Sequence, residues 1–257
     1  MVYLFIALVA FAASLLTLYS GFGLGTLLMP AMAVFVPVEL AVAMTAVVHL
    51  ANNLFKFALV GRHADWRVVL RFGLPAMAAA LLGAWVLGRI AGFEPWTTWT
   101  LGGREFTVTP VKCIVGALLL GFVALEGLPA LQAKAFHPRW LPVGGLLSGF
   151  FGGLSGNQGA LRSAFLLKAG LTKEAFIGTG VVLACLIDLS RLALYARQFS
   201  AVLDRVDWTL LAVAVLAAFA GAWGGARFIA KITLAQVQRI VGGLLVVVAL
   251  GLIAGVF

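Results

Sequence analysis

Long apolar blocks alternate with short polar ones along the whole chain. No Asp, Glu, Lys or Arg occurs within residues 1–38, 40–55, 140–161, 208–226 or 240–257. A helix needs roughly 20 apolar residues to cross the hydrocarbon core of a bilayer. The pattern therefore predicts an all-α polytopic membrane protein with eight spans, near residues 2–20, 38–60, 66–90, 110–127, 141–154, 174–195, 207–229 and 237–256.

Two further apolar pieces, residues 24–36 and 159–169, are too short to cross a membrane at 1.5 Å per residue. Each follows a glycine-rich break, at residues 20–26 and 152–159. Because glycine costs a helix about 1 kcal/mol relative to alanine, we expect the helix to break at both places. The pieces are predicted half-helices, which either re-enter the membrane or cross it where it is thinned.

Several features occur twice at a nearly constant spacing, which indicates an internal repeat. Thr45 and Thr179 follow the heads of their spans, and an i, i+3 polar pair stands at Asn53 and Lys56 and again at Asp188 and Arg191. The dipeptide Asp-Trp at 65–66 recurs at 207–208. We expect one integral membrane domain made of two repeats, residues 1–130 and 141–257, with residues 92–109 as the longest loop.

Composition narrows the function classes. Of the 257 residues, 63% are apolar and 11% are charged, whereas soluble domains carry about 25% charged residues. The net charge of +9 comes from single cations between apolar blocks, which favours membrane-flanking loops over nucleic-acid binding. The sequence contains no hydrolase, metalloprotease or P-loop motif, so we predict no catalytic residues, metal or cofactor.

The second break carries polar groups at membrane depth, where non-helical backbone is tolerated only beside protein or water. Ser155, Asn157 and Gln158 supply hydrogen-bonding groups, and a half-helix starting near Gly159 directs its positive dipole end at the same point. Arg162 adds a cation that an anion would compensate. Pairing of Arg162 with an acid elsewhere, which would lock two helices together, is the alternative.

A second polar group lies in the first half. His49, Asn52 and Asn53 share a helix face with Lys56 and would form the wall opposite the second break. From the first break, the candidates for anion binding are Gly23, Gly25 and Thr26.

Asp188 and Arg191 are the candidate coupling or structural ion pair. Asp188 is expected deep in its span, where it would carry a proton or hold Arg162. Arg191 stands near the predicted end of the same span, where we expect its side chain to snorkel to the interface.

The paired breaks resemble those of a known family. The stretches 21–25 (GFGLG) and 148–163 (SGFFGGLSGNQGALRS), followed by residues 171–175 (LTKEA) and Thr179, resemble the TauE/SafE sulfite exporter family, also called the toluene sulfonate uptake permeases. The resemblance covers essentially the whole chain. It implies a secondary transporter of sulfite, sulfonates or related small anions in the bacterial inner membrane.

Two other function classes remain open at this stage. An anion channel would use the same helix-end chemistry, and a membrane-embedded enzyme would turn over its substrate without moving it across the bilayer. The expected partners are a small anionic substrate and the lipid bilayer, with no nucleic acid; a homo-oligomer remains open.

Overall fold

The computed structural model describes residues 1–20, 24–127, 136–198, 206–228 and 234–256, with side chains described outside 16–20, 126–127, 226–228 and 234–241. Helices dominate it. The α-helices are α1 (Val2–Ser20), α2 (Leu24–Ala33), α3 (Val38–Val60), α4 (Trp66–Ala91), α5 (Pro110–Gly127), α7 (Leu141–Ser155), α8 (Gly159–Leu166), α9 (Lys173–Gln198), α10 (Trp208–Phe228) and α11 (Leu234–Ile253). Short 3-10 turns stand at η1 (Gly61–His63) and η2 (Pro138–Trp140).

Each predicted span falls on a helix, and each predicted half-helix falls on a short one. Within the described residues, four helices are long and apolar enough to cross a membrane: Val38–His63, Trp66–Ala91, Lys173–Gln198 and Trp208–Gly225. The predicted helical class is therefore confirmed. The number of crossings is not, because α7 has 15 residues and the remaining apolar helices have shorter described windows.

The repeated Asp-Trp dipeptide starts a long helix in both halves. Asp65 accepts hydrogen bonds from the backbone N–H groups of Arg67 and Val68 at 2.9 and 3.2 Å, so it caps α4. Asp207 accepts one from the N–H of Leu210 at 2.9 Å at the start of α10. Asp side chains stabilise helix N-termini in this way because the first backbone N–H groups have no partner within the helix.

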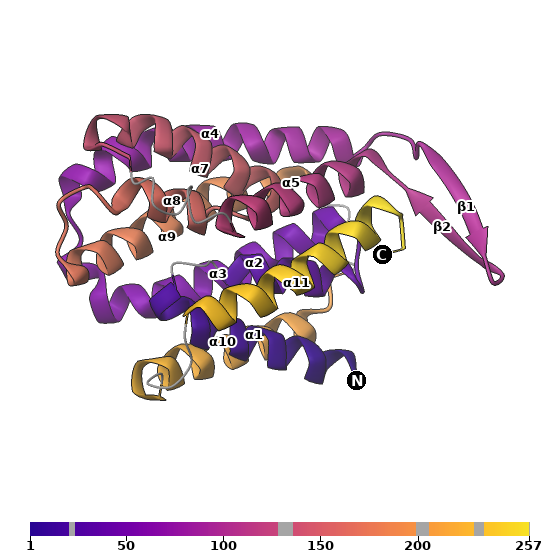
Figure 1. Ribbon diagram of the computed structural model, residues 1–257, viewed down its shortest axis with the longest axis horizontal. Coiled ribbons are helices and arrows are strands. Elements are labelled where there is room, and N and C mark those ends of the chain that lie inside the picture. The colour runs from indigo at the N-terminus through magenta and orange to yellow at the C-terminus, as the bar shows by residue number, and fades with distance from the viewer. Residues whose placement is uncertain (21–23, 128–135, 199–205, 229–233, 257) are drawn as a thin grey trace.

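Two helix pairs pack closely, and each joins a helix of the first half of the chain to a helix of the second half. α4 packs along α7 and α1 packs along α10 (Figure 1). Gly145, Gly149 and Gly153 line the face of α7 that meets α4, and a Cβ at Gly149 would stand 2.0 Å from the carbonyl oxygen of Ala76. Small residues at four-residue spacing let two backbones approach in this manner. The glycines of α7 therefore fix the position of the break that follows it.

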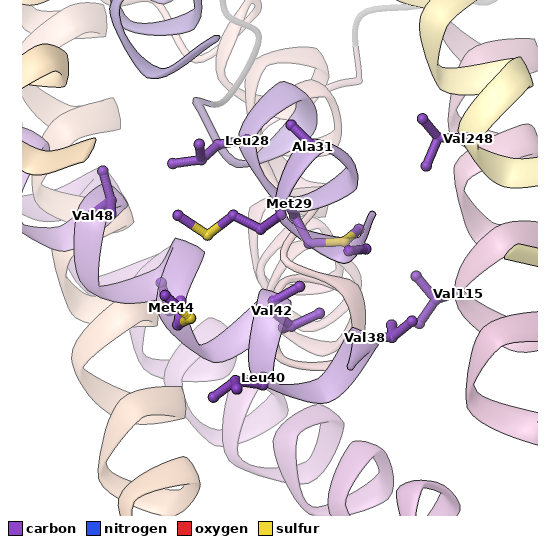
Figure 2. Close-up of a cluster of buried hydrophobic side chains, with 14 of the residues drawn as sticks. Leu28, Met29, Ala31, Val38, Leu40, Val42, Met44, Val48, Val115 and Val248 are labelled. Atoms are coloured by element: carbon purple, nitrogen blue, oxygen red, sulfur yellow. The ribbon is translucent and has the colours of Figure 1, made fainter. Parts of the chain in front are cut away.

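The apolar core forms two clusters. One joins α1, α2 and α3 to α5, α10 and α11, and the other joins the first half of α4 to α7, α8 and α9. Figure 2 shows α2 seated against α3 in the first cluster, with Val115 of α5 and Val248 of α11 beside them. α2 is thus surrounded by apolar protein along most of its length.

One part of the chain departs from the helical expectation. The predicted loop 92–109 contains an antiparallel hairpin of β1 (Thr97–Leu101) and β2 (Arg104–Val108), which projects from the helices in Figure 1. Gly102 and Gly103 make its two-residue turn with φ of 60° and 77°, which suits the twist of a hairpin. The indole N–H of Trp99 donates to the carbonyl of Ala254 at 2.8 Å, which ties the hairpin to the end of α11.

Candidate functional site

Asp188 is the centre of a buried polar network between α3 and α9. Its carboxylate is fully buried, and one oxygen, Oδ2, lies 2.5 Å from Nδ1 of His49 on α3. The other, Oδ1, accepts hydrogen bonds from Nε and Nη2 of Arg191 at 2.9 and 2.7 Å. Buried ions persist only when they are paired and hydrogen-bonded, and Asp188 meets both conditions.

Arg191 belongs to this network and does not snorkel, so that prediction is wrong. Its side chain is fully buried, and Nη1 donates to the carbonyl of Gly152 at 3.0 Å. One turn further along α9, the hydroxyl of Tyr195 donates to the carbonyl of Gly153. These bonds hold the last turn of α7 against α9, because the final carbonyls of a helix need partners outside the helix.

The helix break lies directly beside these contacts. α7 ends at Ser155, and Gly156 follows in the left-handed conformation with φ of 81°, which glycine adopts without strain. A Cβ at Gly25, in the first turn of α2, would stand 3.0 Å from the carbonyl oxygen of Gly156. The second break therefore touches the start of the first short helix. Thr26 is buried beside Gly25, whereas Gly23 lies outside the described residues.

Gln158 connects the Asp188 network to Arg162. Its Nε2 donates to Oδ1 of Asp188 at 3.2 Å, and its Oε1 accepts from Nη1 of Arg162 at 3.3 Å. In the described part of the chain, the ion pairs of Asp188 are with His49 and Arg191. The alternative of a direct Arg162–Asp188 lock is therefore wrong: the two charges are linked through one amide.

Two asparagine side chains are buried with polar atoms that lack partners among the described residues. Asn157 is 4% exposed, and neither its Oδ1 nor its Nδ2 has a hydrogen-bond partner there. Asn52 is fully buried; its Oδ1 accepts from the hydroxyl of Ser14 at 3.1 Å, whereas its Nδ2 has no partner in the described part of the chain. Because a buried polar atom without a partner costs about 1–3 kcal/mol, such atoms in a folded protein call for an explanation.

The start of α8 is also poorly satisfied. α8 begins at Gly159, and its N-cap residue Gln158 makes no side-chain hydrogen bond to the first turn. Ser148 of α7 donates to the carbonyl of Gln158 at 3.0 Å, which holds the break in place but provides no acceptor for the N–H groups. A helix N-terminus of this kind attracts anions, since N–H groups and the dipole act together.

The remaining predicted residues have local roles. Asn53 donates from Nδ2 to the carbonyl of His49 at 2.8 Å and lies beside its imidazole ring. Ser155 donates to the carbonyl of Phe151 in its own helix at 3.0 Å. Lys56 is 6% exposed and interacts electrostatically with Arg162. The first two side chains are occupied within single helices, and Lys56 adds positive charge near α8.

Sequence reasoning missed Ser14, Ser148 and Tyr195. Tyr195 lies four residues after Arg191 and so shares its helix face, which is a usable signal. Ser14 stands in an apolar run with no distinguishing pattern, whereas Ser148 opens the stretch 148–163 that carries the family resemblance. Within the described residues, no group of three or more His, Cys, Asp or Glu side chains is placed to hold a metal ion.

The fold and this site define a class: a multi-pass helical membrane protein with buried polar side chains gathered at a helix break. The model of the family described as sulfite exporter TauE/SafE matches residues 6–252, so the chain belongs to this family of membrane transporters. No curated protein and no solved structure matches it.

Proposed function

We propose that this protein is a secondary transporter of small anions, with sulfite and sulfonates as the substrate class, in the bacterial inner membrane. The anion binds at the N-terminus of α8, between Asn157, Arg162 and the first N–H groups of that helix. The observation that carries the proposal is Asn157, a buried side chain with two unpartnered polar atoms beside an uncapped helix N-terminus.

Charge supports an anionic ligand. Asp188 is already paired with Arg191 and His49, while Arg162 reaches it only through the neutral amide of Gln158. An anion beside Arg162 balances the charge of this guanidinium, which is costly in a low-dielectric interior.

Architecture supports a site at the interface of two repeats, residues 1–130 and 141–257. Both halves have a helix, a break, a short helix and two long helices in the same order. Exchanging the halves exchanges the α1–α10 contact with α7–α4, and leaves the α3–α9 and α5–α11 contacts in place. Transporters built this way bind substrate near the membrane midplane at broken helices, and the Gly25–Gly156 contact brings both breaks to one point.

Thermal unfolding of the purified protein tests the proposal. Sulfite, sulfate, thiosulfate, sulfonates and small carboxylates are compared with the protein alone. An anion at about 100 times its Kd adds about 2.7 kcal/mol to the unfolding free energy. We expect one anion class to stabilise the wild type and Arg162→Gln to lose that stabilisation.

The matched control is Arg71→Gln, which removes an exposed arginine from α4 and keeps the response. Equal stabilisation of Arg162→Gln by the same anion would remove Arg162 from the site. In proteoliposomes, saturable uptake with counterflow exchange supports a transporter, whereas unsaturable flux without exchange would indicate a channel.

A further inference from the structure

The orientation of the Gln158 amide is dictated by its two neighbours. A carboxylate only accepts hydrogen bonds and a guanidinium only donates them. With Asp188 on one side at 3.2 Å and Arg162 on the other at 3.3 Å, Nε2 must face the acid and Oε1 must face the arginine. One end of the amide is therefore hydrogen-bonded to Asp188, and the other end is hydrogen-bonded to Arg162 at the proposed anion site.

A proton bound to the network has a defined position. Oδ1 of Asp188 accepts from Arg191 twice and from Gln158 once, so it is fully used. Oδ2 faces Nδ1 of His49 at 2.5 Å, within the range of charge-assisted hydrogen bonds. One proton already lies between these two atoms as the Nδ1–H of a neutral imidazole, so the pair carries a net charge of −1. A further proton binds Nε2 of His49 and changes this net charge to 0.

Several charged and titratable groups surround the His49–Asp188 pair, so a change in its net charge changes the electrostatic balance around Arg162. Arg162 faces it from α8, and Cys185, Arg191 and Tyr195 face it from α9, while Lys56 of α3 lies within electrostatic range of Arg162. α2 and α7 carry no titratable side chain, and the arginines of α4 are exposed. Protonation of His49 therefore adds a positive charge beside these cations. An anion beside Arg162 compensates this added charge.

We propose that the His49–Asp188 pair takes up one proton when an anion binds beside Arg162, and that the Gln158 amide transmits the change between the two positions. The inference rests on the proposed function and adds that anion transport is coupled to proton uptake. The proton comes from solvent and forms one N–H bond, at Nε2 of His49; no other covalent bond changes. Once the pair is neutral, its attraction for the Nε2 group of Gln158 weakens, and this group turns toward the anion. Because such coupling is reciprocal, acidification tightens anion binding.

Calorimetry with the full chain in detergent tests the coupling. The probe is ethanesulfonate, whose own charge is constant between pH 5 and 9, so any proton uptake belongs to the protein. Titrations in buffers of different ionisation enthalpy count the protons taken up per anion. We expect about one proton per anion across part of this range, and an affinity that rises up to tenfold for each unit of acidification there.

His49→Gln keeps a donor for Asp188 but cannot titrate, so we expect its affinity to be independent of pH. Gln158→Leu breaks the link, so we expect weaker binding and at most half the proton uptake of the wild type. His63→Gln, which replaces an exposed histidine, is the matched control and keeps the wild-type slope.

The outcomes separate the two proposals. Binding of ethanesulfonate by the wild type without proton uptake overturns the coupling and leaves the proposed function intact. Absence of binding for ethanesulfonate, sulfate and sulfite at every pH overturns both. If the variants do not fold, proton counting with the wild type alone decides.

Discussion

The two short helices after the glycine-rich breaks occupy equivalent places in the chain but very different surroundings. α2 is buried among apolar side chains on nearly every face, and Leu28 and Met29 are fully buried there. α8 is only partly buried and carries Arg162 at the edge of a polar network. Within the described residues, α2 is therefore held by apolar packing, whereas α8 begins at a residue that makes no side-chain capping hydrogen bond.

The long helices that follow, α3 and α9, differ in the polar side chains that they supply to the network. α3 supplies the neutral donors His49, Asn52 and Asn53, and α9 supplies the charged pair of Asp188 and Arg191. Neither half holds a complete site, because the carboxylate of one half is completed by the imidazole of the other. This asymmetry can be tested by substitutions on either side of it.

Arg191→Leu should have the largest effect. It removes two hydrogen bonds and a charge from a fully buried carboxylate, and it releases the last turn of α7. Breaking a buried pair by removing one partner costs about 3–5 kcal/mol. Denaturant unfolding in mixed micelles measures this loss. The double variant Asp188→Leu/Arg191→Leu should recover most of it, and a loss below about 1 kcal/mol for the single variant would contradict the arrangement.

Asn157→Leu should change stability and binding in opposite directions. Leucine has a similar shape but no polar atoms, so the variant without anion should be more stable by about 1 kcal/mol, since an unpartnered buried amide is removed. The stabilisation that an anion adds should fall by a similar amount. Thermal unfolding with and without ethanesulfonate measures both quantities.

Met29→Ala on α2 is the contrasting control. It opens a cavity in an apolar core and should lower stability by about 2–5 kcal/mol. Because Met29 lies in the apolar core and not among the residues proposed to bind the anion, the increment in stability produced by the anion should be unchanged. If Met29→Ala removes that increment while Asn157→Leu retains it, the roles assigned to α2 and α8 are reversed.

Most of the helices could be predicted because charge-free blocks and glycine clusters report directly on membrane depth and on breaks. The position of Arg191 could not, because the predicted span ended at residue 195 whereas α9 continues to Gln198. That extension places Arg191 two turns from the helix end, where its side chain bonds to Asp188 and to the carbonyl of Gly152. The His49–Asp188 contact joins residues 139 apart in the chain, and no periodicity within one helix reveals such a pair.

The sequence contains a signal for the hairpin, but the overall composition outweighs it. Residues 98–101 alternate threonine with larger side chains before Gly102-Gly103, and aromatic and β-branched residues follow in 104–108, which is the pattern of a two-residue hairpin. Composition favours helices everywhere else, and a polar segment between spans is therefore predicted to be a loop. Docking of Trp99 on α11 stabilises a pair of strands that would be marginal alone.

The smallest expected effect concerns Asp207, the aspartate that caps α10. Asp207 accepts a hydrogen bond from the hydroxyl of Tyr3 at 2.5 Å, which joins α10 to α1, and this bond together with the N–H of Leu210 holds the pKa of Asp207 below its ordinary value. A carboxyl whose pKa is lower in the folded state stabilises the fold above its unfolded pKa, and this contribution is lost as pH falls through the folded pKa. Asp207→Asn should therefore flatten the acid limb of a plot of unfolding temperature against pH below about 4. Tyr3→Phe removes the same hydrogen bond and should flatten that limb partly; a limb as steep as that of the wild type in both variants would show that the tie between α1 and α10 does not depend on this carboxylate.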